Sequence, residues 1–160
     1  MAFIAGSYTI TYGGQSLGQL EDKTLSLEIV YQGEVIRGDF LSQSIQDWIY
    51  NGGDCFMQFT CLEANAVGVG LLTAPYTSGD LGAVGVPGMF ATDYSNVMVL
   101  TKRSGPNASP SVITCNTAIL APGYPVNILL GNTLKRVPIR MQLLPSLYSD
   151  SKYRWFKPTT

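Results

Sequence analysis

The sequence predicts a single all-β-dominated domain, a β-sandwich or barrel of two antiparallel sheets with one short α-helix and a long inter-subunit loop. Three observations predict the strand content. Short segments with alternating apolar and polar residues recur along the chain. Turn signals separate these segments, with 17 glycines and 9 prolines in 160 residues. Hydrophobic residues make up 46% of the chain, enough for a sizeable core and too many for a disordered protein.

The surface is expected to be poor in charge. Charged residues are only 13% of the chain, about half the usual share for a soluble domain, so we expect other subunits to cover much of it. No apolar run approaches the roughly 18 residues of a membrane span, and the N-terminal residues lack the pattern of a signal peptide. We therefore expect folding in a cytoplasm, where the three cysteines remain reduced and buried.

Two amphipathic strands are expected in the N-terminal part. In residues 7–12, tyrosine and isoleucine alternate with serine and threonine, which is typical of a half-buried strand. Gly13 and Gly14 then provide a tight turn. Residues 24–31 repeat the alternation, so that leucine, isoleucine and tyrosine share one face while Glu28 points to the other.

Residues 41–52 are expected to form the one convincing helix. Ile45, Trp48 and Ile49 stand at positions i, i+3 and i+4 and would share an apolar face. Gly52 can adopt the left-handed conformation that ends a helix. The expected role of this helix is to pack against one open end or face of the sheets.

Residues 54–63 read as another strand. Cys55, Met57, Phe59 and Cys61 alternate with other residues and would lie on one face. Because free cysteines pack as small hydrophobic groups, we place both thiols in the core.

Residues 64–95 are expected to form the long loop. The segment contains six glycines and two prolines, and its only charged residues are Asp80 and Asp93. A loop of this length in a compact domain calls for a function. Either it forms short extra strands on its own domain, or it buries apolar side chains on a neighbouring subunit. The second interpretation, which low charge favours, assigns assembly contacts to Leu71, Leu72, Tyr76, Val84, Val86, Met89 and Phe90.

Strands return in the last third. They are expected in residues 96–101, 111–120, 126–130 and 134–144. Pro138 cannot donate to a ladder, which predicts a sheet edge or a bulge at that position.

The C-terminal tail, residues 145–160, ends in a pair of large rings. Trp155 and Phe156 are expected either to dock on the core or to contact a partner.

Charge divides unevenly between the two halves. Residues 1–95 contain two basic and ten acidic side chains, a balance of −8, and residues 96–160 contain eight basic and one acidic, a balance of +7. If the halves form opposite faces, copies attract head to tail; if the sandwich interleaves them, the asymmetry vanishes. The basic residues are scattered and form no run typical of nucleic-acid binding.

Catalytic and metal-binding patterns are scarce. The chain has no histidine, which removes Ser-His and Cys-His nucleophile pairs and most zinc sites. No glycine motif of the phosphate-binding kind occurs. We therefore expect a protein that is not an enzyme and that has no catalytic residue, metal or cofactor.

Four stretches suggest a family. The segments GSYTITYGGQSLG, TLSLEIVY, RGDFLSQSIQDWIYNGG and RVPIRMQLLPSLYSDSKYRWF resemble, in order and spacing, bacteriophage tail tube proteins, also called major tail proteins. Type VI secretion tube proteins share that general fold. The resemblance implies two sheets closing toward a barrel, one helix at the side, and hexameric rings that stack into a conduit for genomic DNA. Residues 64–95 match the inter-ring loop of the family by position and apolar character.

The resemblance also implies partners and a location. The protomer would bind copies of itself, tape-measure, baseplate and terminator proteins and possibly a sheath protein, with no membrane. It would belong to the virion tail and assemble in the bacterial host cytoplasm. Double-stranded DNA would pass the lumen without specific binding, which favours a neutral or acidic lining with Glu28 as the candidate residue.

Two alternatives stay open. A tail terminator, neck or baseplate hub component would form a single ring and would not polymerise. An all-β module for carbohydrate or protein surfaces would instead expose an aromatic platform of Tyr94, Tyr124, Trp155 and Phe156.

Overall fold

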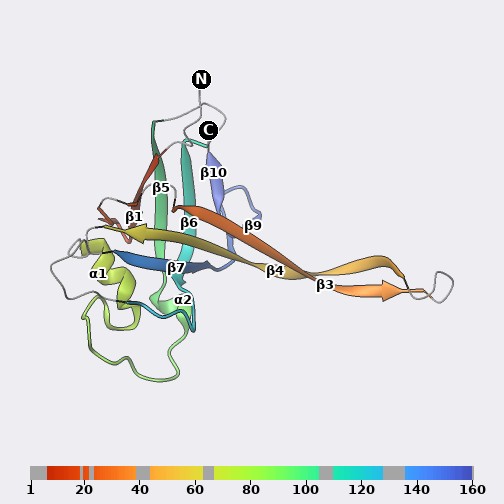
Figure 1. The fold of residues 1–160 in the computed structure, drawn as a ribbon, viewed down its shortest axis with the longest axis horizontal. Coiled ribbons are helices and arrows are strands. Elements are labelled where there is room, and N and C mark those ends of the chain that lie inside the picture. Colours follow the sequence, from red (N-terminus) through yellow and green to blue (C-terminus); the bar gives the residue numbers. More distant parts are fainter. Residues whose placement is uncertain are drawn as a thin grey trace.

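The computed structural model describes residues 7–18, 20–21, 24–38, 44–62, 67–104, 110–127 and 136–159. It confirms the all-β-dominated class: its strands form an eight-stranded antiparallel sheet and a separate two-stranded sheet. Two short α-helices accompany them. Figure 1 shows a body of crossing strands from which one hairpin projects.

One half of the large sheet contains β1 (Ser7–Tyr12), β2 (Gln15–Ser16), β5 (Asn96–Ser104), β6 (Val112–Leu120) and β10 (Lys157–Thr159). The order is β2-β1-β5-β6, and β10 pairs with β6. β1 has the bounds expected for residues 7–12, and β5 extends the strand expected in residues 96–101 to residue 104. β6 begins one residue after the expected start at residue 111.

The other half contains β7 (Val137–Leu143), β4 (Ile45–Cys61) and β3 (Ser26–Arg37), in that order from β6. β6 and β7 pair only through Ala118–Leu120 and Met141–Leu143, so the sheet turns a corner there. The two halves consequently cross in Figure 1 and face each other as the two layers of a sandwich.

The core lies between these layers. Alternation along each strand sends one set of side chains inward, and the buried set includes Ile10, Tyr12, Met57, Phe59, Met98, Leu100, Ile139 and Met141. All three cysteines are buried there, as expected. Pro138 lies in the part of β7 that pairs with β4 and not yet with β6. The backbone N–H that proline lacks therefore removes no hydrogen bond on the β6 side.

The helix expected in residues 41–52 is wrong. Ile45 and the residues after it belong to strand β4, and residues 41–43 lie outside the described part of the chain. Trp48 pairs with Val35 and Ile49 pairs with Glu34, so the two neighbours point to opposite faces of a ladder. β-branched and aromatic residues suit such a ladder, and β3 provides a long partner strand.

The glycine-rich segment contains the actual helices. They are α1 (Val67–Thr73) and α2 (Ala91–Tyr94), with the 3-10 turn η2 (Pro75–Thr77) between them. Gly68 lies against β2, because a Cβ there would stand 2.5 Å from the backbone oxygen of Ser16. The expectation of extra strands in this segment is therefore wrong for the described residues.

Two further differences occur near the C-terminus. Val126 and Asn127 are not in a strand, and residues 128–130 lie outside the described ranges. The C-terminal segment forms β8 (Ser146–Leu147) and β9 (Tyr153–Arg154), which pair with each other before the chain continues into β10.

Candidate assembly surface

The outer end of the β3–β4 hairpin projects from the body of the fold (Figure 1). β7 pairs with β4 only from Cys55 to Cys61, so residues 45–53 have β3 as their one ladder partner among the described strands. We call residues 31–38 and 44–53 the arm. Figure 1 shows it extending well beyond the body.

Glycines mark the base of the arm. The β3–β4 register shifts between Tyr31 and Gly33, and Gly52 has φ = 103°. A Cβ on Gly53 would stand 2.5 Å from the backbone oxygen of Val30. Only glycine allows this close approach, so the three glycines build a bulge that increases the twist of the hairpin.

One face of the arm is apolar. It continues the core face of β3 and β4 outward through Tyr31, Val35, Trp48 and Tyr50. The exposed fractions of Tyr31, Tyr50 and Trp48 are 66%, 64% and 65%. The rings of Tyr31 and Tyr50 meet edge to face with centroids 6.0 Å apart. Large side chains of the kind that usually fill a core are therefore exposed on this face.

The opposite face is acidic. The ladder register places Glu34 and Asp47 on it, together with Ile36 and Ile49. The same face of β3 and β4 continues toward the body through Glu28 and Asp54. Asp54 accepts a 3.0 Å hydrogen bond from Gln32. Asp47 accepts one of 2.8 Å from the backbone N–H of Trp48. The arm therefore has two faces of different chemistry.

Glu28 lies on this acidic face, next to the body. Its carboxylate stands 3.7 Å from the guanidinium of Arg140, and its side chain is 52% exposed. Arg140 also stacks over Phe56, 4.1 Å from the ring centroid. Asp54, Phe56, Tyr124 and Arg140 border a shallow hollow of about 450 Å³ on this side of the sheet.

The residues assigned to the inter-subunit loop do not behave alike. Leu72 is fully buried and Leu71 packs against the core, so both belong to the interior of their own domain. Their assignment to an assembly contact is corrected, because α1 turns them toward the sheet. By contrast Val84, Val86 and Phe90 are 91%, 70% and 74% exposed.

Tyr76 and Met89 are neither fully buried nor as exposed as Val84, Val86 and Phe90. With Val86 they border a small hollow of about 260 Å³. The ring of Tyr76 lies 5.6 Å from that of Tyr94.

The C-terminal rings dock on their own domain. Trp155 and Phe156 are partly buried and pack against the core, which agrees with the first of the two expected roles. Trp155 also meets Tyr31 at the base of the arm, with centroids 6.2 Å apart. The Tyr148 hydroxyl receives a 2.8 Å hydrogen bond from the backbone N–H of Asn116, and burial raises the pKa of this phenol.

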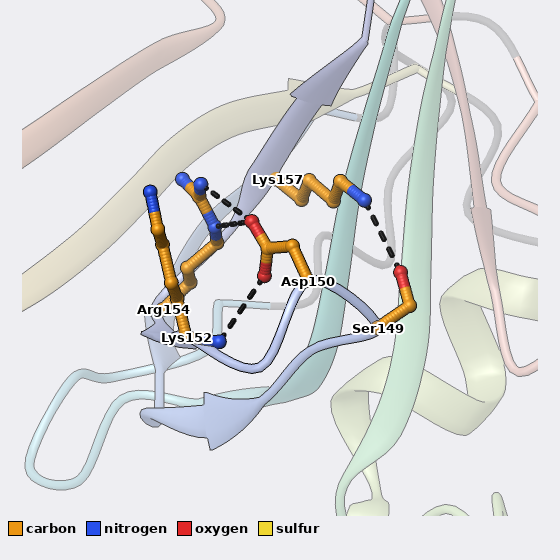
Figure 2. A network of polar contacts seen from close by, with 5 residues as sticks. All are labelled: Ser149, Asp150, Lys152, Arg154 and Lys157. Atoms are coloured by element: carbon orange, nitrogen blue, oxygen red, sulfur yellow. Dashed lines mark hydrogen bonds and ion pairs between the residues drawn. The ribbon is translucent and has the colours of Figure 1, made fainter.

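A polar network holds the C-terminal hairpin, residues 146–154. Figure 2 shows Asp150 at its centre, where Arg154 donates from Nε at 2.9 Å and from Nη2 at 2.7 Å. This guanidinium holds the pKa of Asp150 below its usual range. Lys157 donates to Ser149 at 3.2 Å. Leu147 and Tyr153 remain exposed on the same hairpin, at 56% and 77%.

The buried thiols are poor nucleophiles. Burial raises the pKa of Cys55 to about 11 and that of Cys61 and Cys115 to about 12, so all three are protonated near neutral pH. The described residues contain no group of three side chains suited to a metal ion. In the same ranges, no helix has the length and apolar character needed to cross a membrane.

Three of the four rings expected to form an aromatic platform have different neighbours. Tyr94 lies beside Tyr76, Tyr124 borders the hollow near Arg140, and Trp155 packs at the base of the arm. The surface that sequence reasoning missed is the arm itself. The cluster of tryptophan, tyrosine and isoleucine at residues 45–50 was its signal, because these residue types favour strands.

No family model matches the sequence, and no curated protein matches it significantly.

Proposed function

We propose that the protein is a structural subunit that assembles with copies of itself into rings, and that the rings stack into a bacteriophage tail tube through which genomic DNA passes. One observation carries this proposal. The arm exposes about two thirds of the surface of Tyr31, Trp48 and Tyr50, on a hairpin that projects from the body (Figure 1).

The arm adds little to the stability of an isolated subunit. A two-stranded hairpin alone is marginally stable in water, because one face of each strand has nothing to pack against. Exposed apolar patches of this kind mark interaction sites in soluble proteins. A neighbouring copy that covers the apolar face would stabilise the arm and account for the low charge of the chain.

Sheet edges support a ring. β3 ends the large sheet on one side and β2 ends it on the other. A long edge strand without proline, such as β3, is a template for pairing with another chain. Contact between two different edges is head to tail, and it closes into a ring when the rotation per copy divides a full turn.

The acidic face suits the lining of a DNA conduit. Contacts between cations and phosphates would slow the passage of DNA, whereas carboxylates repel it. Glu28 and Asp54 lie on the part of this face nearest the body, and we assign them to the lumen. The exposed residues Val84, Val86 and Phe90 are assigned to the contact between stacked rings.

This function places the protein in the virion tail, after assembly in the cytoplasm of a bacterial host. Its further partners would be tape-measure, baseplate and terminator proteins. The same arm would also serve a terminator, neck or hub component, which makes one ring and stops. Stacking distinguishes the two functions.

Electron microscopy of the purified protein, with light scattering to measure mass in solution, tests the proposal. We expect hollow filaments of stacked rings. A variant in which a two-residue Asn-Gly turn replaces residues 33–51 should stay monomeric while keeping the body fold, as judged by circular dichroism. Isolated rings would favour the single-ring component. A wild-type protein that remains monomeric at millimolar concentration would contradict self-assembly.

A further inference from the structure

Resting on the proposed self-assembly, we infer that the acidic face of the arm in one copy docks on the C-terminal hairpin of the next copy. The contact would pair Glu34 and Asp47 with the basic side chains around Lys152. Apolar residues on both surfaces would pack between the charges.

The distal arm supplies the acidic half of this contact. Glu34 pairs with Ile49 across the ladder and Asp47 pairs with Ile36, so the four side chains share one face. Ile36 and Ile49 are 42% and 51% exposed. In the part of the chain that the structure describes, ion pairs join Arg136 to Glu21, Arg140 to Glu28 and Arg154 to Asp150.

The C-terminal hairpin and the following residues 155–157 supply the basic half. Residues 146–157 contain three basic side chains, Lys152, Arg154 and Lys157, against one carboxylate, Asp150. Arg154 neutralises Asp150 at 2.7 Å, which leaves the segment with a net charge of +2 (Figure 2). Leu147 and Tyr153 are exposed beside these charges. The hairpin therefore matches the arm in charge and in apolar content.

Geometry assigns the contact to two different copies. The ring of Trp155 meets Tyr31, so a subunit's own hairpin lies at the base of its arm. Glu34 and the residues beyond it extend away from that base, and six strand residues past Tyr31 span on the order of 20 Å. In Figure 1 the arm extends away from the body past β9. We therefore assign the hairpin that it contacts to a neighbouring copy.

Charge reversal tests this docking. The arm variant Glu34→Lys/Asp47→Lys and the hairpin variant Lys152→Glu are each expected to raise the critical concentration for assembly at least about tenfold. The arm variant meets the basic hairpin with like charge, and Lys152→Glu removes the net positive charge of the hairpin segment while it sets a carboxylate against Glu34 and Asp47. Lys152 is suited to this change, since the side chain is exposed and the described bond of this residue to Asp150 comes from its backbone N–H. An equimolar mixture of the two variants should assemble again, as should the chain that carries all three substitutions.

Matched controls separate charge from other effects. Glu34→Asp/Asp47→Glu and Lys152→Arg keep the charges and should assemble as the wild type does. Arg103→Glu reverses an exposed charge at the end of β5 and should have little effect on this contact. Sodium chloride should raise the wild-type critical concentration, because salt screens exposed charge pairs.

The outcomes also separate this inference from the proposed function. If the wild type forms tubes and both reversed variants form them at the same concentration, the docking is refuted and the tube function stands. If the two variants fail alone and also fail as a mixture, the pairing of these two surfaces is refuted. If the wild type never assembles, both the proposed function and the docking are refuted.

Discussion

The hydroxyl of Tyr12 on β1 donates a 2.8 Å hydrogen bond to the backbone carbonyl of Ala118 on β6, across the intervening strand β5. Both residues are fully buried. The bond lies where the β5–β6 register shifts between Asn96 and Met98. A side chain thus supports the sheet at a point where the regular ladder is interrupted.

Tyr12→Phe should lower the free energy of unfolding by about 1–2 kcal/mol, because the variant leaves a buried carbonyl without its hydroxyl donor. Urea denaturation of the dilute, unassembled protein measures this change. Tyr8→Phe is the matched control: the Tyr8 hydroxyl bonds to Pro110 at 2.8 Å in a partly buried site, so water can replace it and the loss should be smaller. Equal losses in the two variants would contradict a special role for Tyr12.

Two glycines of α1 should respond in opposite ways to alanine. A Cβ on Gly68 would stand 2.5 Å from the oxygen of Ser16 and 2.8 Å from that of Gln15, whereas a Cβ on Gly70 meets nothing within 4 Å. Gly68→Ala should therefore destabilise the fold by about 1–3 kcal/mol through overpacking. Gly70→Ala should stabilise it by about 0.5–1 kcal/mol, because alanine favours a helix.

Thermal unfolding of the two variants beside the wild type measures both effects. The pair is matched in chemistry and in helix, so a general cost of mutating α1 would shift both variants the same way. Destabilisation by Gly70→Ala would contradict the helical conformation of this segment.

The strands of the body could be predicted because their two faces differ. In residues 7–12 and 54–61 the alternation separates core from solvent, and the fold repeats it. The arm could not be predicted in this way. Its apolar face is exposed in the part of the chain that the structure describes, so alternation does not separate core from solvent there. Ile45, Trp48 and Ile49 match the i, i+3, i+4 spacing of an amphipathic helix although they lie on a strand.

The α1 helix was missed for the opposite reason. Intrinsic propensity disfavours Gly68 and Gly70 in a helix, but tertiary packing against β2 requires a residue without a Cβ at Gly68. The acidic face of the arm was partly visible from sequence, since the outward position of Glu28 follows from strand alternation. Asp47 could not be assigned to that face from the sequence, because its position depends on strand β4 and on the register shifts between β3 and β4.

The buried thiols predict a loss of stability in alkaline solution. In the unfolded chain a thiol ionises near its ordinary pKa of 9.0, whereas burial raises the pKa of Cys115 to about 12. Above pH 9 the unfolded state binds fewer protons, so the free energy of unfolding falls as pH rises toward the folded pKa. Each thiol should contribute a slope approaching about 1.4 kcal/mol per pH unit.

Urea unfolding at several pH values between 8 and about 11, with a reductant present, measures this slope. Cys115→Ala should make the slope shallower by about one thiol's share, even though the smaller side chain lowers stability at every pH. An unchanged slope in this variant would show that Cys115 does not titrate differently in the folded and unfolded states.

The apolar face of the arm should matter for assembly and not for the stability of the subunit. Trp48 and Tyr50 are 65% and 64% exposed, so Trp48→Thr/Tyr50→Thr removes little buried area from the monomer and keeps residues that favour strands. The free energy of unfolding should change by less than about 0.5 kcal/mol per substitution. Assembly should be lost, because a neighbouring copy would no longer bury two aromatic side chains, each worth about 2 kcal/mol or more when they anchor an interface.

Light scattering and electron microscopy report the assembly, and urea denaturation reports the stability of the subunit. Tyr153→Thr is a useful comparison, since Tyr153 is 77% exposed on the C-terminal hairpin, which we dock on the acidic face of the arm and not on its apolar face. It should weaken assembly less than the double substitution, because it removes one aromatic side chain and not two. Tubes that form normally from the Trp48→Thr/Tyr50→Thr protein would place the subunit contacts elsewhere on the surface, with the exposed residues between α1 and α2 as the next segment to change.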